Sequence, residues 1–260
     1  MKLVALSAVP PGVVIPILPV FAPEGTVAIT CVSESTVKLV AATPPKVTFV
    51  VCVKLTPVIV TTGRLSEFGF AGQARRAVSQ ALALAPEPNV RTLGALALSR
   101  SGELIQASRL ADALDQELPL HLTMQNYWLP LIRASVELGH GSPARAVDRL
   151  QVTLPYELGS TDIFQLATMY PVYVRGLAYL QAKQSREAAA EFQKMLDRPS
   201  IIINFPLRAL AHLQLARARM LSHDNEGARK AYADFLTLWK DADPDIPILK
   251  EAKAEYAKLP

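Results

Sequence analysis

The sequence predicts an all-α fold over residues 68–260, a right-handed superhelix of stacked helical hairpins, preceded by a segment of β or disordered structure at residues 1–67. From Phe68 onward, alanine and leucine recur at helical spacing between clusters of Gly, Pro, Asn and Asp. This pattern repeats about every 40 residues, which is typical of a solenoid. A change in composition separates the first segment from the repeats.

The overall composition excludes several classes of protein. With 50% hydrophobic and 19% charged residues, a chain of 260 residues can bury a core, which excludes wholesale disorder. The net charge of +4 is too small and too scattered for direct binding of DNA or RNA. The two cysteines form no disulfide framework and lack zinc-site spacing, so we expect a reducing, cytoplasmic location.

The first segment differs from the rest of the chain in its residues. Residues 1–63 contain fifteen Val, eight Pro and eight Thr but six charged residues, whereas all sixteen arginines lie from Arg64 onward. Prolines from Pro10 onward interrupt its apolar start, so we expect no membrane-spanning helix. The blocks TVAITCV, TVKLVAA and KVTFVVCVKL predict short strands. We therefore treat residues 1–67 as a doubtful domain, with the character of a fused or mis-joined leader.

The repeat region begins with half a repeat. Residues 69–86 have the pattern of a second helix, with Ala74 at its small position, but the preceding TPVIVTTGRL is too β-branched to be its partner helix. An unpaired helix leaves an apolar face uncovered. We expect residues 40–65 to pack on that face as a cap.

Four helical hairpins follow at about 89–118, 122–155, 165–198 and 206–240, and a capping helix at 246–259 ends the chain. Each second helix carries a small residue, at Ala107, Ala146, Ala188 and Ala228, which lie 39, 42 and 40 residues apart. Gly176 is the small residue of one first helix. Small side chains are needed where the two helices of a hairpin cross, because larger ones would push them apart.

The third hairpin carries the strongest motif, with Gly176, Tyr179, Ala188 and Phe192 in register. These residues resemble the pattern of the tetratricopeptide repeat. The stretches NYWLPLIRA, MYPVYVRGLAYL and INFPLRALAHLQLARA, and residues 68–260 generally, are similar to the carboxyl-terminal repeat region of acidobacterial serine/threonine protein kinases. The resemblance implies a bacterial protein with a regulatory or interaction role in signalling. The kinase itself is missing, since the sequence has no Gly-rich phosphate loop and no HRD or DFG motif.

A solenoid of this kind predicts a protein-interaction scaffold that binds a peptide or a partner protein in its concave groove, without a cofactor. The first helices line that groove. By phase, the groove-facing candidates are Trp128, Leu131, Ser135, Tyr170, Tyr173, Leu177, Leu213, Arg217 and Met220. Trp, Tyr and Arg most often supply binding energy at interfaces. The clamp that some tetratricopeptide repeats use for terminal carboxylates needs Asn and Lys, whereas this chain has Ile132, Val174 and Gln214.

Catalytic and metal motifs are sparse. The chain has no GxSxG elbow, and its four histidines form no HExxH pair, so we expect neither an enzyme nor a metal site. The alternative is a small esterase-like hydrolase, because Ser35 and Lys38 fit the SxxK spacing in which a lysine activates a serine nucleophile. No second motif of such enzymes accompanies this pair.

Overall fold

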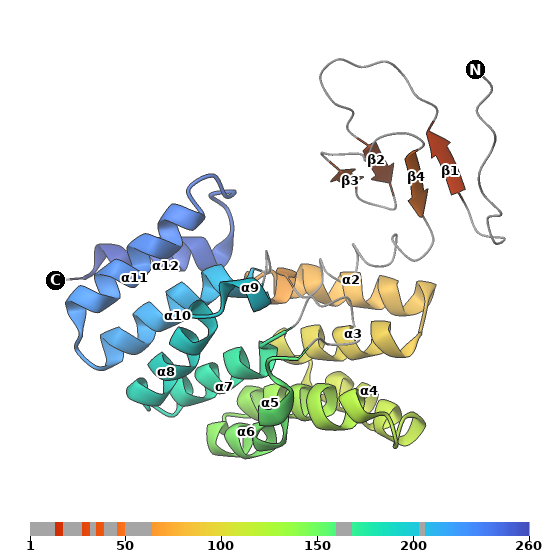
Figure 1. Ribbon diagram of the computed structural model, residues 1–260, viewed down its shortest axis with the longest axis horizontal. Helices are drawn as coiled ribbons and strands as arrows, with labels where there is room; N and C mark the ends of the chain where they lie inside the picture. The colour runs from red at the N-terminus through yellow and green to blue at the C-terminus, as the bar shows by residue number, and fades with distance from the viewer. Residues whose placement is uncertain are drawn as a thin grey trace. The chain divides into compact units, whose positions relative to one another are not determined.

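The computed structural model describes the backbone of strands β1 (Val14–Ile17), β2 (Ala28–Cys31), β3 (Ser35–Lys38) and β4 (Lys46–Phe49), and residues 64–159, 168–202 and 206–259 in full (Figure 1). The chain divides into two units, Met1–Val60 and Thr61–Pro260. Each unit is described by itself.

The strands of the first unit form two antiparallel pairs. β1 pairs with β4, with Val14 opposite Phe49, and β2 pairs with β3, with Cys31 opposite Ser35. β1 is absent from the strands that the sequence predicts, because Pro16 lies inside it and proline disfavours central strands. In a two-stranded sheet every strand is an edge strand, where a missing backbone donor is tolerated.

The second unit is built from helical hairpins, which confirms the prediction of an all-α repeat. One helical turn at residues 64–67 and α2 (Ala71–Leu84) precede the hairpins. The first hairpin is α3 (Pro88–Arg100) with α4 (Leu104–Glu117). In the second, the π-helix η1 (Met124–Trp128) leads into α5 (Leu129–Gly139), which pairs with α6 (Pro143–Leu150) and the 3₁₀-helix η2 (Gln151–Tyr156) that follows it. The third is α7 (Tyr170–Gln181) with α8 (Ser185–Leu196), and the fourth is α10 (Leu207–Leu221) with α11 (Asn225–Leu238). The short α9 (Pro199–Ile202) precedes α10, and α12 (Pro247–Ala257) ends the unit.

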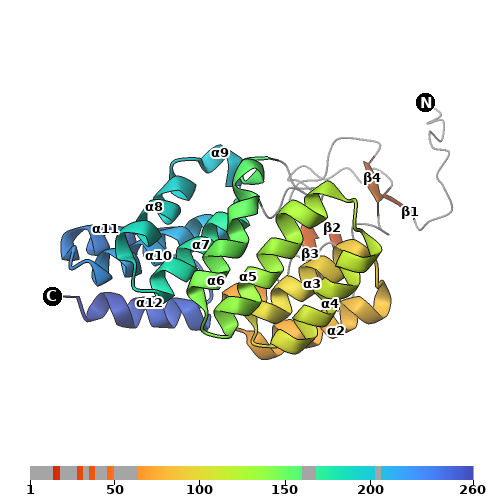
Figure 2. The ribbon, with the colours of Figure 1, turned by 90° about the horizontal axis from the view of Figure 1, so that it is seen from below.

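Successive hairpins stack in chain order. We call α3, α5, α7 and α10 the first helices and α4, α6, α8 and α11 the second helices. Each second helix packs on the first helix that follows it: α4 on α5, α6 on α7, and α8 on α10 (Figures 1 and 2). Neighbouring first helices also pack on one another.

The same turn joins the two helices of all four hairpins. One residue of each turn has a positive φ, at Gly102, Gly141, Lys183 and His223, five residues before the buried alanine of the second helix. The amide of the following residue donates to a carbonyl five residues back at 2.9 Å each time: Glu103 to Leu98, Ser142 to Glu137, Gln184 to Tyr179, and Asp224 to Arg219. These are Schellman turns, in which a left-handed residue lets the last carbonyls of the first helix find donors.

The helices of each hairpin cross at small residues. Ala107, Ala146, Ala188 and Ala228 have no exposed surface. A Cβ on Gly176 would lie 2.6 Å from two ring atoms of Phe192, closer than packed carbon atoms approach. The backbone of α7 therefore lies directly against an aromatic ring of α8.

The first described residues of the unit contact its last hairpin. The segment 64–70, which we call the entry segment, places Phe68 edge-to-face on Trp239 with ring centroids 4.9 Å apart. The carbonyl of Phe68 accepts a hydrogen bond of 3.2 Å from the amide of Ile248 in α12. Most of the predicted cap, residues 40–65, lies outside the described part of this unit. Among the described residues, α2 packs on α3, where Val78 lies against Gly94.

We expect Gly176→Ala to lower the free energy of unfolding by about 1–3 kcal/mol, because the ring of Phe192 must move to make room. Gly72→Ala is the matched control, since a Cβ there meets nothing within 4 Å, and it should raise stability by about 0.5–1 kcal/mol. Urea unfolding followed by helical circular dichroism measures both. Equal effects of the two substitutions would contradict the crossing at Gly176.

The turns between paired helices give a second test. Substitutions at their residues of positive φ change the backbone strain without creating a side-chain clash. Gly102→Lys should cost about 1 kcal/mol, because its φ is +86° and a Cβ there meets no neighbour. The reverse change, Lys183→Gly, should stabilise the chain by about 0.5–1 kcal/mol, because glycine adopts the left-handed conformation without strain. Thermal and urea unfolding of both variants check the opposite signs.

Candidate functional site

The groove residues predicted from the sequence lie on the first helices, but most are covered. Trp128, Leu131, Tyr170, Tyr173 and Leu213 are 0–3% exposed, and Ser135 is also buried. Arg217 is partly exposed, as are Leu177 and Met220. Their role in binding a peptide stays a prediction. Side chains of other elements of the same unit contact several of these residues.

One carboxylate joins the first and third hairpins. Glu67, in the entry segment, accepts hydrogen bonds from Arg100 Nε at 2.7 Å and Nη2 at 3.2 Å, and from the hydroxyl of Tyr170 at 2.7 Å. The Glu67 side chain is 5% exposed. Burial and then the Glu67 carboxylate raise the pKa of Tyr170 well above its ordinary value, so its hydroxyl remains a donor.

A second carboxylate binds at the other end of the same face. Glu255, from α12, accepts from Arg217 Nε at 3.0 Å and Nη2 at 2.9 Å. The hydroxyl of Tyr232 donates to the same carboxylate at 2.9 Å. Although burial opposes its charge, the hydrogen bonds to Glu255 raise the pKa of Arg217.

Tyr173 and Gln214 connect the two ends. The ring of Tyr173 packs edge-to-face on Tyr170, with centroids 6.1 Å apart, and its hydroxyl accepts from Gln214 Nε2 at 3.4 Å. Gln214 in turn accepts from Arg217 Nη1 at 3.4 Å. We call this set the inner-face ladder: Arg100, Glu67, Tyr170, Tyr173, Gln214, Arg217 and Glu255.

The ladder is a carboxylate-binding surface at both ends. Two arginines present planar forks of N–H donors, and each holds the carboxylate of an element near one end of the unit. The entry segment is also held through its backbone, by the amide of Ile248. Arg100 of α3 and Tyr170 of α7 therefore bind the carboxylate of the entry segment, while Trp239 and α12 contact its Phe68.

Sequence reasoning missed half of this arrangement. It singled out Tyr170, Tyr173 and Arg217, but not Glu67, Arg100 or Glu255. Glu67 and Tyr170 are 103 residues apart, so no local pattern relates them. The repeat alignment offers no hint either, because Glu67 lies before the first periodic helix.

A separate ion cluster supports the third hairpin. Arg175, whose side chain is 2% exposed, donates to Glu157 at 2.5 Å and to Glu191 at 2.7 Å, and Lys194 also donates to Glu157 at 2.5 Å. Burial opposes ionisation of Glu157, but the hydrogen bonds from Arg175 and Lys194 outweigh it and hold its pKa below the ordinary value. The cluster ties η2 to α7 and α8.

The hydrolase alternative finds no support in the backbone. Ser35 and Lys38 are the two ends of β3, paired with Cys31 and Ala28 respectively. Residues three apart share a face on a helix but lie well separated along an extended strand. Hydrolysis at Ser35 stays a prediction, and the side chains of this strand lie outside the described residues.

The part of the chain that the structure describes also lacks two other features. No group of three or more His, Cys, Asp or Glu side chains among them could hold a metal ion. None of the helices described for this chain is long and apolar enough to cross a membrane.

Comparisons with known proteins place this chain near one solved structure at low identity. No protein-family model and no curated protein matches the chain. It is similar to a solved structure described as "MamA RS-1 ArsTM double mutant", with 18% identity, a TM-score of 0.42, and coverage of 74% of this chain and 98% of that one. The resemblance to repeat regions of bacterial kinases has no support in these comparisons.

We expect Glu157→Gln to lower the free energy of unfolding by about 3–5 kcal/mol at pH 7, because the buried Arg175 loses a charged partner. Since folding lowers the pKa of Glu157, its contribution is complete above the unfolded value of about 4.3 and is lost as pH falls through the folded value. The difference in free energy of unfolding between Glu157→Gln and the unmodified chain should therefore stay constant from about pH 7 to 5 and shrink in more acidic solution.

Glu103→Gln is the control for this measurement. Glu103 pairs with Arg75 across side chains that are 43% and 46% exposed, so its loss should cost at most about 1 kcal/mol. Urea unfolding at several pH values compares the two variants. A Glu157→Gln effect as small as that of Glu103→Gln would show that the cluster does not support the fold.

Proposed function

We propose that the helical unit is a protein-interaction scaffold that binds an acidic segment of a partner protein along the inner-face ladder. The observation that carries the proposal is the double capture of carboxylates, Glu67 by Arg100 and Glu255 by Arg217. Both carboxylates come from elements that are not part of the stacked hairpins. A partner that offers a similar carboxylate could take the place of one of them.

The two arginine–carboxylate pairs of the ladder differ in how readily a partner's carboxylate can replace the chain's own. Arg100 and Glu67 are 21% and 5% exposed, so separating them would leave buried charge without a partner. Arg217 and Glu255 are 24% and 37% exposed, and a pair this accessible contributes about 0.2–1 kcal/mol. The Arg217 end is therefore where a partner's carboxylate would enter first.

The aromatic residues of the ladder fit the same role. Tyr173 and Gln214 lie buried between the two arginines, and the Gln214 amide, which donates to the Tyr173 hydroxyl and accepts from Arg217, holds the Arg217 guanidinium in place for a partner's carboxylate. A function as the interaction tail of a bacterial signalling protein, which the sequence resemblance implies, is compatible with such a scaffold and stays a prediction.

The test uses a fluorescein-labelled peptide with alternating Glu and Phe, and the same peptide with Gln in place of Glu. We expect the acidic peptide to bind the full chain more tightly, and higher salt to weaken it. Glu255→Gln should tighten binding by up to about fivefold, because it frees Arg217 from a pair worth at most about 1 kcal/mol. Fluorescence anisotropy measures each Kd.

Glu251→Gln is the matched control, because Glu251 lies on the same helix and contacts Arg217 at a longer 3.3 Å. Its effect should be smaller than that of Glu255→Gln. Arg217→Gln should abolish the preference for the acidic peptide. The proposal would be rejected if all three variants bound both peptides as the unmodified chain does.

A further inference from the structure

The entry segment occupies a site whose walls come from elements that are far apart in the stack. Its Glu67 bonds to Arg100 at the end of α3 and to Tyr170 at the start of α7. Its Phe68 packs on Trp239, the residue directly after α11. Because α3 packs on α5 and α5 on α7, the second hairpin separates the two hairpins that hold Glu67. The segment therefore lies across the stack, as a bound peptide does, and does not extend the stack as a further repeat would.

The first side-chain site in this contact selects a carboxylate. Arg100 donates to Glu67 through Nε and Nη2, and the hydroxyl of Tyr170 donates a third hydrogen bond. An arginine stays charged in a protein, and its planar fork matches a carboxylate. If Glu67 left without a replacement, the largely covered charge of Arg100 would lack a partner. A ligand that takes this place must bring its own carboxylate.

The second side-chain site selects an aromatic ring. The ring of Phe68 meets Trp239 edge to face, and the ring of Trp239 also lies 4.9 Å from that of Phe235. Edge-to-face ring pairs are favoured beyond the apolar area that they bury. The carbonyl of Phe68 accepts from the amide of Ile248, a contact that any peptide backbone can make. Sequence selectivity therefore rests on the carboxylate and the ring of two consecutive residues.

The entry segment lies at the surface of the unit and can leave without the first helix. Within residues 64–70, Glu67 alone is buried, whereas Arg64 and Gly69 are exposed and the others are partly covered. Gly69 joins the segment to α2 with a φ of +92°, so the chain turns sharply there. Since α2 packs on α3 by contacts of its own, release of the segment leaves α2 in place.

Backbone strain next to Tyr170 marks the same site. Met169 is fully buried and has a φ of +64°, a conformation that costs free energy for a residue with a side chain. The left-handed residues Lys183 and His223 lie in the turns between paired helices, whereas Met169 precedes the first residue of α7. Strain of this kind clusters at active sites and ligand clamps.

We infer that the entry segment is an internal ligand, and that its site binds a segment of a partner protein in which an acidic residue is followed directly by an aromatic one. Such a segment restores the carboxylate on Arg100 and the ring on Trp239 as it displaces Glu67 and Phe68, so no buried charge is left unpaired. The bound entry segment keeps the site closed to weaker ligands. This inference rests on the proposed function, because it names the partner sequence for the Arg100 end of the ladder.

The test uses a peptide with the sequence of residues 64–69, labelled with fluorescein at its amino end and amidated at the other. Fluorescence anisotropy measures its Kd for the full chain. Phe68→Ala vacates the ring site, so this variant should bind the peptide several-fold more tightly than the unmodified chain. Phe70→Ala is the matched control and should gain less, because the ring of Phe70 contacts no other aromatic ring among the described residues.

The peptide's own sequence tests the two side-chain sites. Replacing its Glu by Gln, or its Phe by Ala, should weaken binding to the Phe68→Ala chain by roughly tenfold in each case. Equal binding of the three peptides would overturn the inference. So would equal Kd values for the unmodified chain, Phe68→Ala and Phe70→Ala.

Glu67→Gln combined with Phe68→Ala empties both sites. The peptide should raise the Tm of this double variant as its concentration increases, since it binds the folded state alone, and should raise that of the unmodified chain less. Circular dichroism shows whether the double variant folds, and if it does not, Phe68→Ala alone decides the test. Equal shifts of Tm in a folded double variant and in the unmodified chain would contradict displacement of the segment.

Two arginine variants separate this inference from the proposed function. Arg100→Gln, added to the double variant, should remove the preference for the Glu peptide over the Gln peptide. If Arg217→Gln, added to Phe68→Ala, removed that preference instead, the carboxylate would bind at the other end of the ladder. That result would overturn this inference and leave the proposed function standing.

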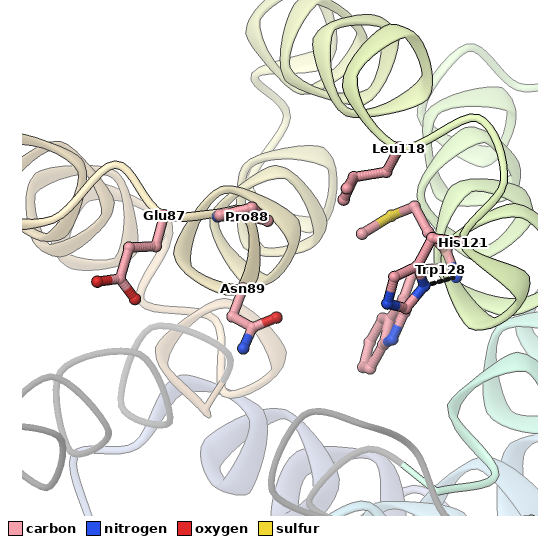
Figure 3. Close-up of a pocket in the computed structure, with 7 residues that line it drawn as sticks. Glu87, Pro88, Asn89, Leu118, His121 and Trp128 are labelled. Atoms are coloured by element: carbon pink, nitrogen blue, oxygen red, sulfur yellow. Dashed lines mark hydrogen bonds between the residues drawn. The ribbon is translucent and has the colours of Figure 1, made fainter.

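A separate pocket offers the peptide an alternative apolar site. It has a volume of about 310 Å³ and lies at the starts of α3 and η1, with Pro88 and Asn89 on one side and Leu118 and Trp128 on the other (Figure 3). Asn89 lies about three helical turns from Arg100 on α3, so the pocket is distinct from the site of the entry segment. Asn89→Phe narrows the pocket from an exposed position and should bind the peptide as the unmodified chain does. Loss of binding in this variant would overturn the inference.

Exchange of the entry segment between two copies of the chain would use the same contacts. Sedimentation of the unmodified chain at increasing concentration tests this arrangement. A monomer at every concentration supports a different protein as the partner. A dimer that Phe68→Ala abolishes would identify a second copy as the occupant and would overturn the inference.

Discussion

The carboxylate of Glu67 ties together parts of the helical unit that stacking alone would leave independent. In an array of hairpins each repeat contacts its neighbours, and stability is close to a sum of local terms. Here Glu67 bonds to the last residue of α3 and the first residue of α7, and the next residue, Phe68, packs on Trp239. One short segment therefore contacts the first, third and fourth hairpins. The burial of the tyrosines beneath it follows from that position.

The repeats themselves depend on a different constraint, the close crossing of paired helices. It operates within about 40 residues of sequence, and its signs are a small residue and a periodic apolar face. For this reason the sequence predicts the hairpins and the final helix well. The sequence does not predict the left-handed residues of the turns at Lys183 and His223, because neither residue type indicates that conformation as glycine does. It also misses η1, whose cause is the single residue Pro130.

The candidate site was harder to predict for physical reasons. Helical phase correctly places Tyr173 and Arg217 on the first helices, but phase cannot say what lies over them. The covering groups, Glu67 and Glu255, come from outside the periodic pattern, and their contacts span up to 103 residues. Trp128 shows the same limit: its position in the repeat suggests a groove, whereas its side chain is buried and forms part of the wall of a separate pocket at the starts of α3 and η1.

The contact between the entry segment and α12 also bears on how this unit can change over evolution. Open arrays gain and lose whole repeats readily, since a new hairpin needs only two compatible neighbours. In this unit an inserted hairpin would carry Trp239 and Ile248 away from Phe68, breaking the ring contact and the backbone hydrogen bond together. The contacts of the entry segment therefore disfavour a change in the number of repeats, whereas substitutions elsewhere and changes in loop length leave these contacts in place.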